Sequence, residues 1–553
     1  MTDSHIFSQP ARTPRTAHAI AAARATVAVL ALLLIGLVST PVAAQDYGET
    51  SFENSGAEEA QDAFLNGLLL LHSFEYPEAR DLFQEAQSID PDFAMAVWGE
   101  AMTHNHPIWM VQDREAALEA LAKLGDTPDA QLDATPTERE RHYLRTLHVL
   151  YGADTPEPAS KEDRDDQYAE AMADLADAYP DDLDARAFHA LSILGTAHEG
   201  REFSVYMRSA AVAEEVFDAN PRHPGAAHYL IHAYDDPVHA PLGLRPARIY
   251  ADIAPKASHA LHMPSHIFFA LGMWDRGAAS NVDSYEAERD QAAQNDANLG
   301  GGGYHALHWL AYARIQQGRY EEALEVTNRA IRHVEDAEGP STGYERYMMS
   351  AYPASYVVET KQWEALANFP INLSDDYSDR QIATVRSVQG MAALSKGDRP
   401  AAEQYHDQAK EAADEDGREE THIPALQLRG LLELDAGNTD AALSTLAEAA
   451  EREDARPLSF GPAWPLKPAH ELYGETLLSL DRAEEAQKQF QLSLKRYPNR
   501  ALSLLGLAKA ANRAGDAETA REAHETLRAI WHDADPGIRD QLTTLSARSA
   551  SSP

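Results

Sequence analysis

Residues 79–91 read ARDLFQEAQSIDP, and residues 486–498 read AQKQFQLSLKRYP. Both stretches carry a small residue, an aromatic residue four places later, a second small residue after three more and a proline after a further five. Small residues let two helices pack closely, an aromatic ring fills the remaining gap, and a proline ends a helix. The same pattern near both ends of the chain predicts a repeating helical unit.

Turns of one type separate the helical stretches between these two ends. Each turn consists of a glycine, one or two polar residues and the start of an alanine-rich stretch. The examples are LGMWDRGA around Gly272, QGRYEEA around Gly318, KGDRPAA around Gly397, AGNTDAA around Gly437 and AGDAETA around Gly515. A repeat array grows by stacking neighbours, so 553 residues need not form three or four separate cores.

With these motifs, the sequence resembles the tetratricopeptide-repeat proteins over most of residues 57–532. The resemblance implies an all-α fold, a right-handed superhelical solenoid of about eight or nine helix-turn-helix repeats, whose first helices line a concave groove. Segments 124–138, 151–166, 195–203 and 294–304 are rich in Pro, Gly or Asp and depart from the pattern. The repeat boundaries at these segments stay open.

The first 44 residues have the pattern of a secretory signal peptide. Three arginines precede the apolar run VAVLALLLIGLV at 27–38, and small residues lead up to Gln45. Twelve apolar residues are too few for a comfortable membrane span, so we expect cleavage after Ala44 and a periplasmic or secreted protein with no stable span after cleavage. An uncleaved anchor is the alternative. We expect a flexible N-terminus at 45–56 and a C-terminal tail at 533–553.

The composition excludes several classes of function. The chain has 47 Lys and Arg against 88 Asp and Glu, a formal charge of −41, which argues against binding to nucleic acid or anionic lipid. Only 10 of the basic residues are Lys, a composition typical of salt-adapted or GC-rich bacteria. The absence of cysteine excludes disulfides, thiolate zinc sites and cysteine nucleophiles. Any metal would therefore bind nitrogen, oxygen or thioether ligands.

Histidine is the most informative residue type, because nine of the 24 histidines fall between residues 223 and 308. His228 and His232 are four residues apart, so both project from one face of a helix. His262 and His266 repeat this pair 34 residues later, which equals the repeat length. A third copy follows at an offset of 46, and Tyr312 takes the place of its second histidine. Three adjacent first helices are thus expected to present imidazoles in register.

This pattern predicts a metal or small-ligand site in the central segment 220–312. Imidazole nitrogen binds Zn, Cu, Ni and Fe(II), and a pair four residues apart can reach one ion. Pro264 should interrupt the helix that carries the second pair. The expected metal ligands are His228, His232, His259, His262, His266 and His308. The expected groove residues beside them are Trp98, Met102, Asp235, Asp236, His239, His305 and Tyr312.

Three other interpretations remain open. The groove can bind a protein or peptide partner without metal, or the histidines can simply hydrogen-bond within the array. A metal-dependent enzyme is the third, with Asp235, Asp236 or Tyr312 as the base, but the sequence has no His-Glu-x-x-His, nucleophile elbow or dinucleotide fingerprint. The sequence therefore favours a scaffold or binding protein and leaves catalysis undecided.

Overall fold

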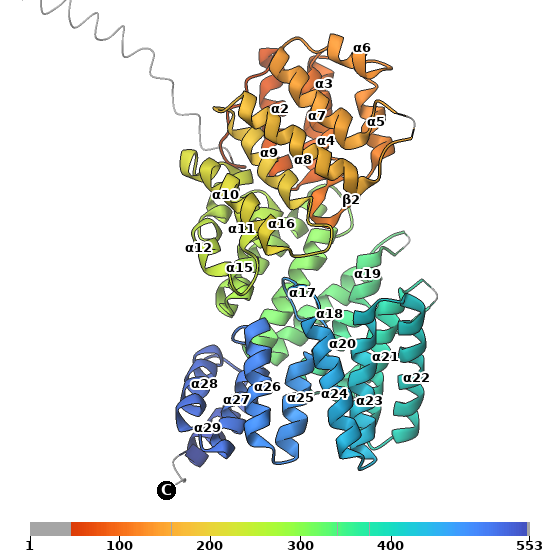
Figure 1. Cartoon of the computed structure of the whole chain (residues 1–553), viewed down its shortest axis with the longest axis vertical. Coiled ribbons are helices and arrows are strands. Elements are labelled where there is room, and N and C mark those ends of the chain that lie inside the picture. The colour runs from red at the N-terminus through yellow and green to blue at the C-terminus, as the bar shows by residue number, and fades with distance from the viewer. Residues whose placement is uncertain (1–45, 156, 340, 375, 550–553) are drawn as a thin grey trace, which may run out of the picture. The chain divides into compact units, whose positions relative to one another are not determined.

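The structure is a computed structural model that describes residues 46–549 except 156, 340 and 375. The expected signal peptide lies outside the described residues. From Asp46 onward the chain forms one compact unit, which is built from successive helices (Figure 1). Side chains are described as far as Leu542.

The first part of the chain contains nine helices and a small hairpin among the described residues. In order these elements are η1 (Glu58–Ala60), α2 (Gln61–His72), α3 (Tyr76–Ile89), α4 (Ala94–Met102), β1 (Asn105–His106), η2 (Pro107–Trp109), β2 (Val111–Gln112), α5 (Arg114–Leu121), α6 (Pro128–Asp133), α7 (Glu138–Tyr151), α8 (Lys161–Ala178), α9 (Leu183–Leu194) and α10 (Phe203–Ala219). The nine are α2 to α10. The two strands pair antiparallel, with Asn105 opposite Gln112.

The central part carries the histidine-rich segment. Its helices are α11 (Pro224–Tyr234), α12 (Ala240–Ala247), α13 (Tyr250–Ile253), α14 (Ser258–His262), α15 (Pro264–Ala270), α16 (Trp274–Gln294), α17 (Gly301–Gln316) and α18 (Tyr320–Asp336).

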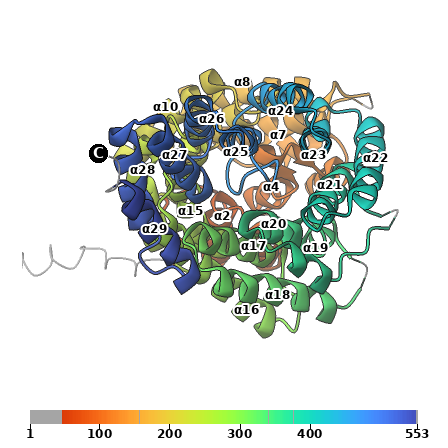
Figure 2. The ribbon, with the colours of Figure 1, turned by 90° about the horizontal axis from the view of Figure 1, so that it is seen from below.

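The last part continues the array. Its elements are α19 (Gly343–Met348), α20 (Ala351–Thr360), η3 (Trp363–Asn368), α21 (Asp379–Ser395), α22 (Arg399–Asp416), η4 (Glu419–His422), α23 (Ile423–Asp435), α24 (Thr439–Asp454), α25 (Ala469–Ser479), α26 (Ala483–Arg496), α27 (Ala501–Ala514), α28 (Ala517–Ile530) and α29 (Pro536–Ser549). The helices α20 to α29 follow one another around a curve in Figure 2.

The packing of two phenylalanines shows that the repeat is real. Phe83 on α3 is fully buried, and its ring lies so close to Gly67 on α2 and Gly99 on α4 that a β-carbon at Gly99 would come within 2.4 Å of it. Phe490 on α26 makes the same contacts with a glycine on the preceding helix and one on the following helix, Gly474 and Gly506. The aromatic ring thus fills the space between three successive helices, as the quoted sequence predicts.

The turns between paired helices share one backbone conformation. The glycines at 272, 318, 397, 437 and 515 all have positive φ, between 62° and 79°, a region that glycine enters without steric cost. Lys361, Asp481 and Phe74 hold the corresponding place in three other turns, with φ between 56° and 60°. The prediction of an all-α solenoid of helix-turn-helix repeats is confirmed.

Both ends of the described chain are more ordered than the sequence suggested. We expected a flexible segment at 45–56, but Phe52 within it is buried and Glu49 N–H donates to the carbonyl of Arg222. The expected C-terminal tail contains α29, and the backbone N–H of Asp535 just before it donates to the carbonyl of Gly318. Among the described residues, none of the helices combines the length and the apolar character that crossing a membrane requires.

Candidate functional site

Three neighbouring helices position the histidines. His228 and His232 lie on α11, His262 and His266 lie on either side of the α14–α15 junction, and α17 carries the third copy. Pro264 is the first residue of α15, where its missing N–H costs least. The backbone at Met263 stays helical, with φ −54° and ψ −36°. The expected helix break is therefore present, but the second pair still projects from one face.

The histidines assemble into two groups of three. In each group, one nitrogen from each ring lies within 4.8 Å of the other two. The groups are His228, His232 and His259, and His262, His266 and His305. Each group takes a pair four residues apart from one first helix and a single histidine from the next. The single histidine is His259 in the first group and His305 in the second. Each is the first residue of the repeated sequence HALH, whose second histidine is equivalent to the first member of the pair. The two groups are thus the same site built twice by the repeat.

In the first group, the rings of the pair face each other. The Nε2 atoms of His228 and His232 are 3.1 Å apart, and His228 Nδ1 donates to the carbonyl of His72 at 2.8 Å. His259 Nε2 is buried and has no hydrogen-bond partner within the described part of the chain. Two imidazoles that bind one Zn²⁺ at about 2.0–2.1 Å and a near-tetrahedral angle place their nitrogens about 3.3 Å apart. The observed spacing is close to that value.

In the second group, the orientation of both rings of the pair is fixed by acceptors. His262 Nδ1 lies 2.8 Å from Asn281 Oδ1, and the amide nitrogen of Asn281 is already used on the carbonyl of Gly277. His266 Nδ1 lies 2.6 Å from a carboxylate oxygen of Asp235. Because an amide oxygen and a carboxylate can only accept, both Nδ1 atoms carry the hydrogen.

The two Nε2 atoms of His262 and His266 then have no hydrogen between them in the neutral state. They lie 3.0 Å apart, so two lone pairs point at each other. A proton or a cation between them removes this repulsion. Histidines that bind metals typically donate the other ring N–H to a carboxylate or carbonyl, as these two do. This pair is therefore arranged as a ligand pair.

Burial keeps these imidazoles uncharged. Burial is the main cause that lowers the pKa of His228, His232 and His259 well below the usual value, and the neighbouring histidines lower it further. The same causes lower the pKa of His262 and His305. The neutral imidazole is the form that binds metal ions.

A third group, formed by His72, Asp184 and His223, is fully buried beside the first. Asp184 Oδ1 accepts from His72 Nε2 at 2.9 Å and from His223 Nε2 at 3.3 Å. His72 Nδ1 lies 2.8 Å from the hydroxyl of Tyr229, and His223 Nδ1 accepts the N–H of Ala226. Every ring nitrogen of this group has a compatible partner, so hydrogen bonding alone accounts for it.

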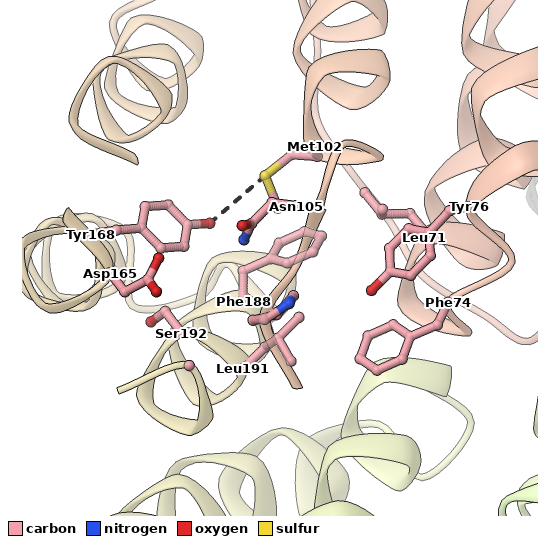
Figure 3. Close-up of a pocket in the computed structure, with 12 residues that line it drawn as sticks. Leu71, Phe74, Tyr76, Met102, Asn105, Asp165, Tyr168, Phe188, Leu191 and Ser192 are labelled. Atoms are coloured by element: carbon pink, nitrogen blue, oxygen red, sulfur yellow. Dashed lines mark hydrogen bonds between the residues drawn. The ribbon is translucent and has the colours of Figure 1, made fainter. Parts of the chain in front are cut away.

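Phe74 separates the first group from a small enclosed cavity. Its ring centre lies 4.2 Å from that of His228 and 5.8 Å from that of His259. Figure 3 shows the cavity on its other side, about 20 Å³ in volume, where the Tyr168 hydroxyl points at the sulfur of Met102. This volume holds about one water molecule. The left-handed backbone of Phe74 thus places an aromatic ring against the histidines, at a turn position where five other turns have glycine.

A larger cavity of about 760 Å³ opens beside the second group and includes His305 and His308 in its lining. The helix-free segment 455–468, between α24 and α25, contributes Phe460, Pro462, Ala463, Trp464 and Leu466 to its lining. Phe460 of this segment lies 5.2 Å from the ring of His266. A β-carbon at Gly461 would lie 2.4 Å from the ring of Trp309. Long irregular segments in compact folds are commonly functional.

The other expected site residues lie at several different places. Asp235 contacts the second group, and its Oδ1 is buried without a partner in the described chain. Asp236 instead binds His239 Nδ1 at 2.8 Å and Arg201 Nε at 3.2 Å, so both Asp236 and His239 belong to a separate ion-pair network.

The remaining four residues also lie outside the two groups. His308 lines the large cavity and meets the hydroxyl of Tyr347 at 3.2 Å. The hydroxyl of Tyr312 accepts from Arg500 at 2.9 Å. Trp98 packs edge-on against aromatic core residues, and Met102 lines the small cavity. None of these four contributes to a group of metal-ligating atoms among the described residues.

Sequence reasoning missed the partners of the rings. Asn281, Phe74 and the segment 455–468 carry no motif, although the four prolines of RPLSFGPAWPLKP (456–468) do mark an irregular stretch. The offset of 46 did indicate that positions 259 and 305 are equivalent, and each begins the repeated sequence HALH.

No protein-family model and no curated protein matches the sequence. Solved structures with a similar helical arrangement include the Cut9–Hcn1 hetero-tetramer of APC/C, at 12% identity and TM-score 0.31, covering 90% of this chain and 78% of that one. A human IFIT1 dimer with m7Gppp-AAAA has 12% sequence identity and a TM-score of 0.36, and the match covers 87% of this chain and 96% of that one. The apo quorum sensor NprR from B. thuringiensis has 10% sequence identity and a TM-score of 0.32, and the match covers 79% of this chain and 98% of that one. Similarity at this level indicates no function for this chain.

Proposed function

We propose that this protein is an exported tetratricopeptide-like scaffold that binds two divalent transition-metal ions, one at each group of three histidines. The contact between the Nε2 atoms of His262 and His266 carries the proposal. Both rings carry a hydrogen on Nδ1, which donates to Asn281 or Asp235, and the two Nε2 atoms lie 3.0 Å apart. A bound cation turns this repulsive contact into ligation.

The first group supports the proposal independently. A buried ring nitrogen without a partner loses its hydration without compensation, at a cost of about 1–3 kcal/mol. His259 Nε2 is such an atom, and it lies next to the facing pair His228 and His232. A metal ion within the group restores a partner to it.

The ligand set limits the identity of the metal. All three ligands of each group are imidazoles, which suit Zn, Cu, Ni and Fe, whereas Mg and Ca prefer oxygen. Three protein ligands leave a coordination position open, as in catalytic zinc sites. Cu²⁺ and Zn²⁺ fit best, because Cu²⁺ binds nitrogen ligands most tightly in this series and Zn²⁺ commonly binds three imidazoles with a fourth position open.

Elemental analysis of the untagged protein tests the proposal. We expect about two equivalents of metal in the native chain and about one after His262→Ala with His266→Ala. His532→Ala is the matched control, because His532 is exposed and bonds only the nearby carbonyl of Ala529. The proposal fails if the native protein contains no stoichiometric metal and is not stabilised against heat by added Zn²⁺, Cu²⁺ or Ni²⁺.

Export is the second part of the proposal and rests on the first 44 residues of the sequence. N-terminal sequencing of the protein from the producing cell should find Gln45 as the first residue in the periplasmic or culture fraction. Recovery of chains that begin before the apolar run 27–38 would contradict cleavage.

A metal-free scaffold for a protein or peptide is the alternative. It predicts that replacing the second histidine pair weakens capture of a partner, while chelation has no effect. Catalysis is the second alternative, and the cavity beside His305 favours it, because an open metal position that adjoins a cavity can receive a substrate. Turnover that a chelator abolishes would support it.

A further inference from the structure

The large cavity beside the second histidine group has an aromatic lining. Six of its lining residues are aromatic: Trp309, Tyr344, Tyr347, Tyr377, Phe460 and Trp464. Its volume of about 760 Å³ lies within the range of small-molecule sites, about 300–1,000 Å³. Flat apolar walls of this kind suit a ligand with one or two rings.

The two arginines in the lining, Arg346 and Arg380, form no ion pair with a carboxylate among the described residues, and Arg380 stacks on an aromatic ring. The guanidinium of Arg380 lies 3.9 Å from the ring centre of Trp464, and Arg456 lies 4.4 Å from the same ring. Within the described residues, no ion pair joins Arg380 to an acidic side chain, although the chain carries a large excess of acidic residues. Burial lowers the pKa of Arg380, and the nearby Arg456 lowers it further.

An anionic ligand would compensate this half-buried charge. A planar guanidinium binds a carboxylate through two parallel hydrogen bonds. The side-chain amide nitrogen of Gln381, also in the lining, offers a further donor, whereas the hydroxyls of Ser378 and Thr384 already donate to Gln381 Oε1 and to the carbonyl of Arg380. The single described carboxylate in the lining is that of Asp376.

The cavity also reaches the second histidine group. His305 is a member of both, and its Nδ1 lies 2.8 Å from the hydroxyl of Tyr344. Phe460 of the lining packs against His266. The same lining thus offers a ligand both the guanidinium of Arg380 and the imidazole of His305.

We propose that this cavity binds a small aromatic carboxylate, with the carboxylate at Arg380 and the ring among the aromatic side chains, adjacent to His305. The proposal that the ligand also meets a metal ion rests on the proposed function, whereas binding at Arg380 does not.

The test measures binding of three probes, benzoate, 4-hydroxycinnamate and naphthalene-2-carboxylate, and of their primary amides, by calorimetry on the full chain. We expect at least one carboxylate to bind about tenfold or more tightly than its amide, because a charge-assisted hydrogen bond is lost in the amide. Arg380→Gln should abolish this difference and leave binding of the amide unchanged. Arg399→Gln is the matched control, since Arg399 pairs at the surface with Glu403 and Asp435.

Elemental analysis of each variant separates this proposal from the metal proposal. If the chain holds no metal but binds a carboxylate in an Arg380-dependent manner, the metal proposal fails and the cavity proposal stands. If metal is present and none of the three carboxylates binds, or if Arg380→Gln binds them as tightly as the native chain, the cavity proposal is overturned.

Discussion

Asn281 offers a test of the tautomer argument that leaves every proposed metal ligand in place. Its side chain is fully buried on α16, and its Oδ1 accepts from His262 Nδ1 at 2.8 Å. Asn281→Leu keeps the approximate size of the side chain and removes the acceptor. The imidazole of His262 is then free to move its hydrogen from Nδ1 to Nε2.

The consequence differs between the metal-bound and metal-free protein. With the hydrogen on Nε2, His262 donates to His266 Nε2 at 3.0 Å, which satisfies the pair without a cation. The same hydrogen blocks ligation. Removal of a hydrogen bond of this kind lowers metal affinity about 10- to 100-fold, or about 1.4–2.7 kcal/mol. The metal-free protein should lose only about 1–2 kcal/mol of stability, because the new hydrogen bond between the two rings replaces the one to Asn281, and the bond from Asn281 to the carbonyl of Gly277 is lost.

Competition with a chromophoric chelator measures the affinity, and urea unfolding of the chelated protein measures the stability. Ser284→Ala is the control, because Ser284 is also buried on α16, almost one turn further on. Equal metal affinity of Asn281→Leu and the native chain would refute the assignment of the hydrogen to Nδ1. A large loss of stability in the metal-free variant would show that Asn281 acts in packing instead.

Three further predictions concern the surroundings of the site. Phe74→Leu should lower the free energy of unfolding by about 1–3 kcal/mol and accelerate metal loss from the first group alone, because the Phe74 ring covers His228. The control Phe64→Leu, in the core, should lower stability without changing the rate of metal release. Equal release rates in the two variants would contradict the covering role of Phe74. Gly461→Ala should destabilise the chain and shift the fluorescence of Trp309. Gly397 has a similar positive φ but open space around it, so Gly397→Ala measures the backbone strain alone. Equal stability of the two variants would show that segment 455–468 does not depend on the contact with Trp309. The stability of the metal-free chain should fall as the pH drops from about 6.5 to about 4. Burial of His72, beside Asp184, His223 and Tyr229, lowers its pKa to about 4, so the unfolded chain takes up the proton at a higher pH than the folded chain does. A free energy of unfolding that stays constant over this pH range would contradict the neutral burial of His72.

The repeat made the fold predictable from the sequence. Spacings such as Ala79, Phe83 and Ala86 report local packing between adjacent helices, and the structure places Phe83 between two glycines as this packing requires. The expectation for segment 45–56 differed from the structure because its one large apolar residue, Phe52, packs against residues far along the chain, including Tyr143. Contacts of this kind leave no periodic signal.

The histidines were predictable as a set, but their grouping was not. Each group combines residues from two neighbouring repeats, so its membership depends on the stagger between these repeats, which places position 305 in the second group and leaves His308 outside. The acceptors that fix the rings, Asn281 and the carbonyl of His72, come from other helices. Backbone acceptors carry no sequence signature at all. The chemistry was therefore visible in the residue types, and its arrangement required the three-dimensional structure.

An anomalous difference map from crystals of the metal-loaded protein, recorded at the absorption edge of the bound metal, tests the central claim most directly. The arrangement of the rings predicts two peaks, one among His228, His232 and His259 and one among His262, His266 and His305. No peak at either group, or a peak only at His72, Asp184 and His223, would contradict it.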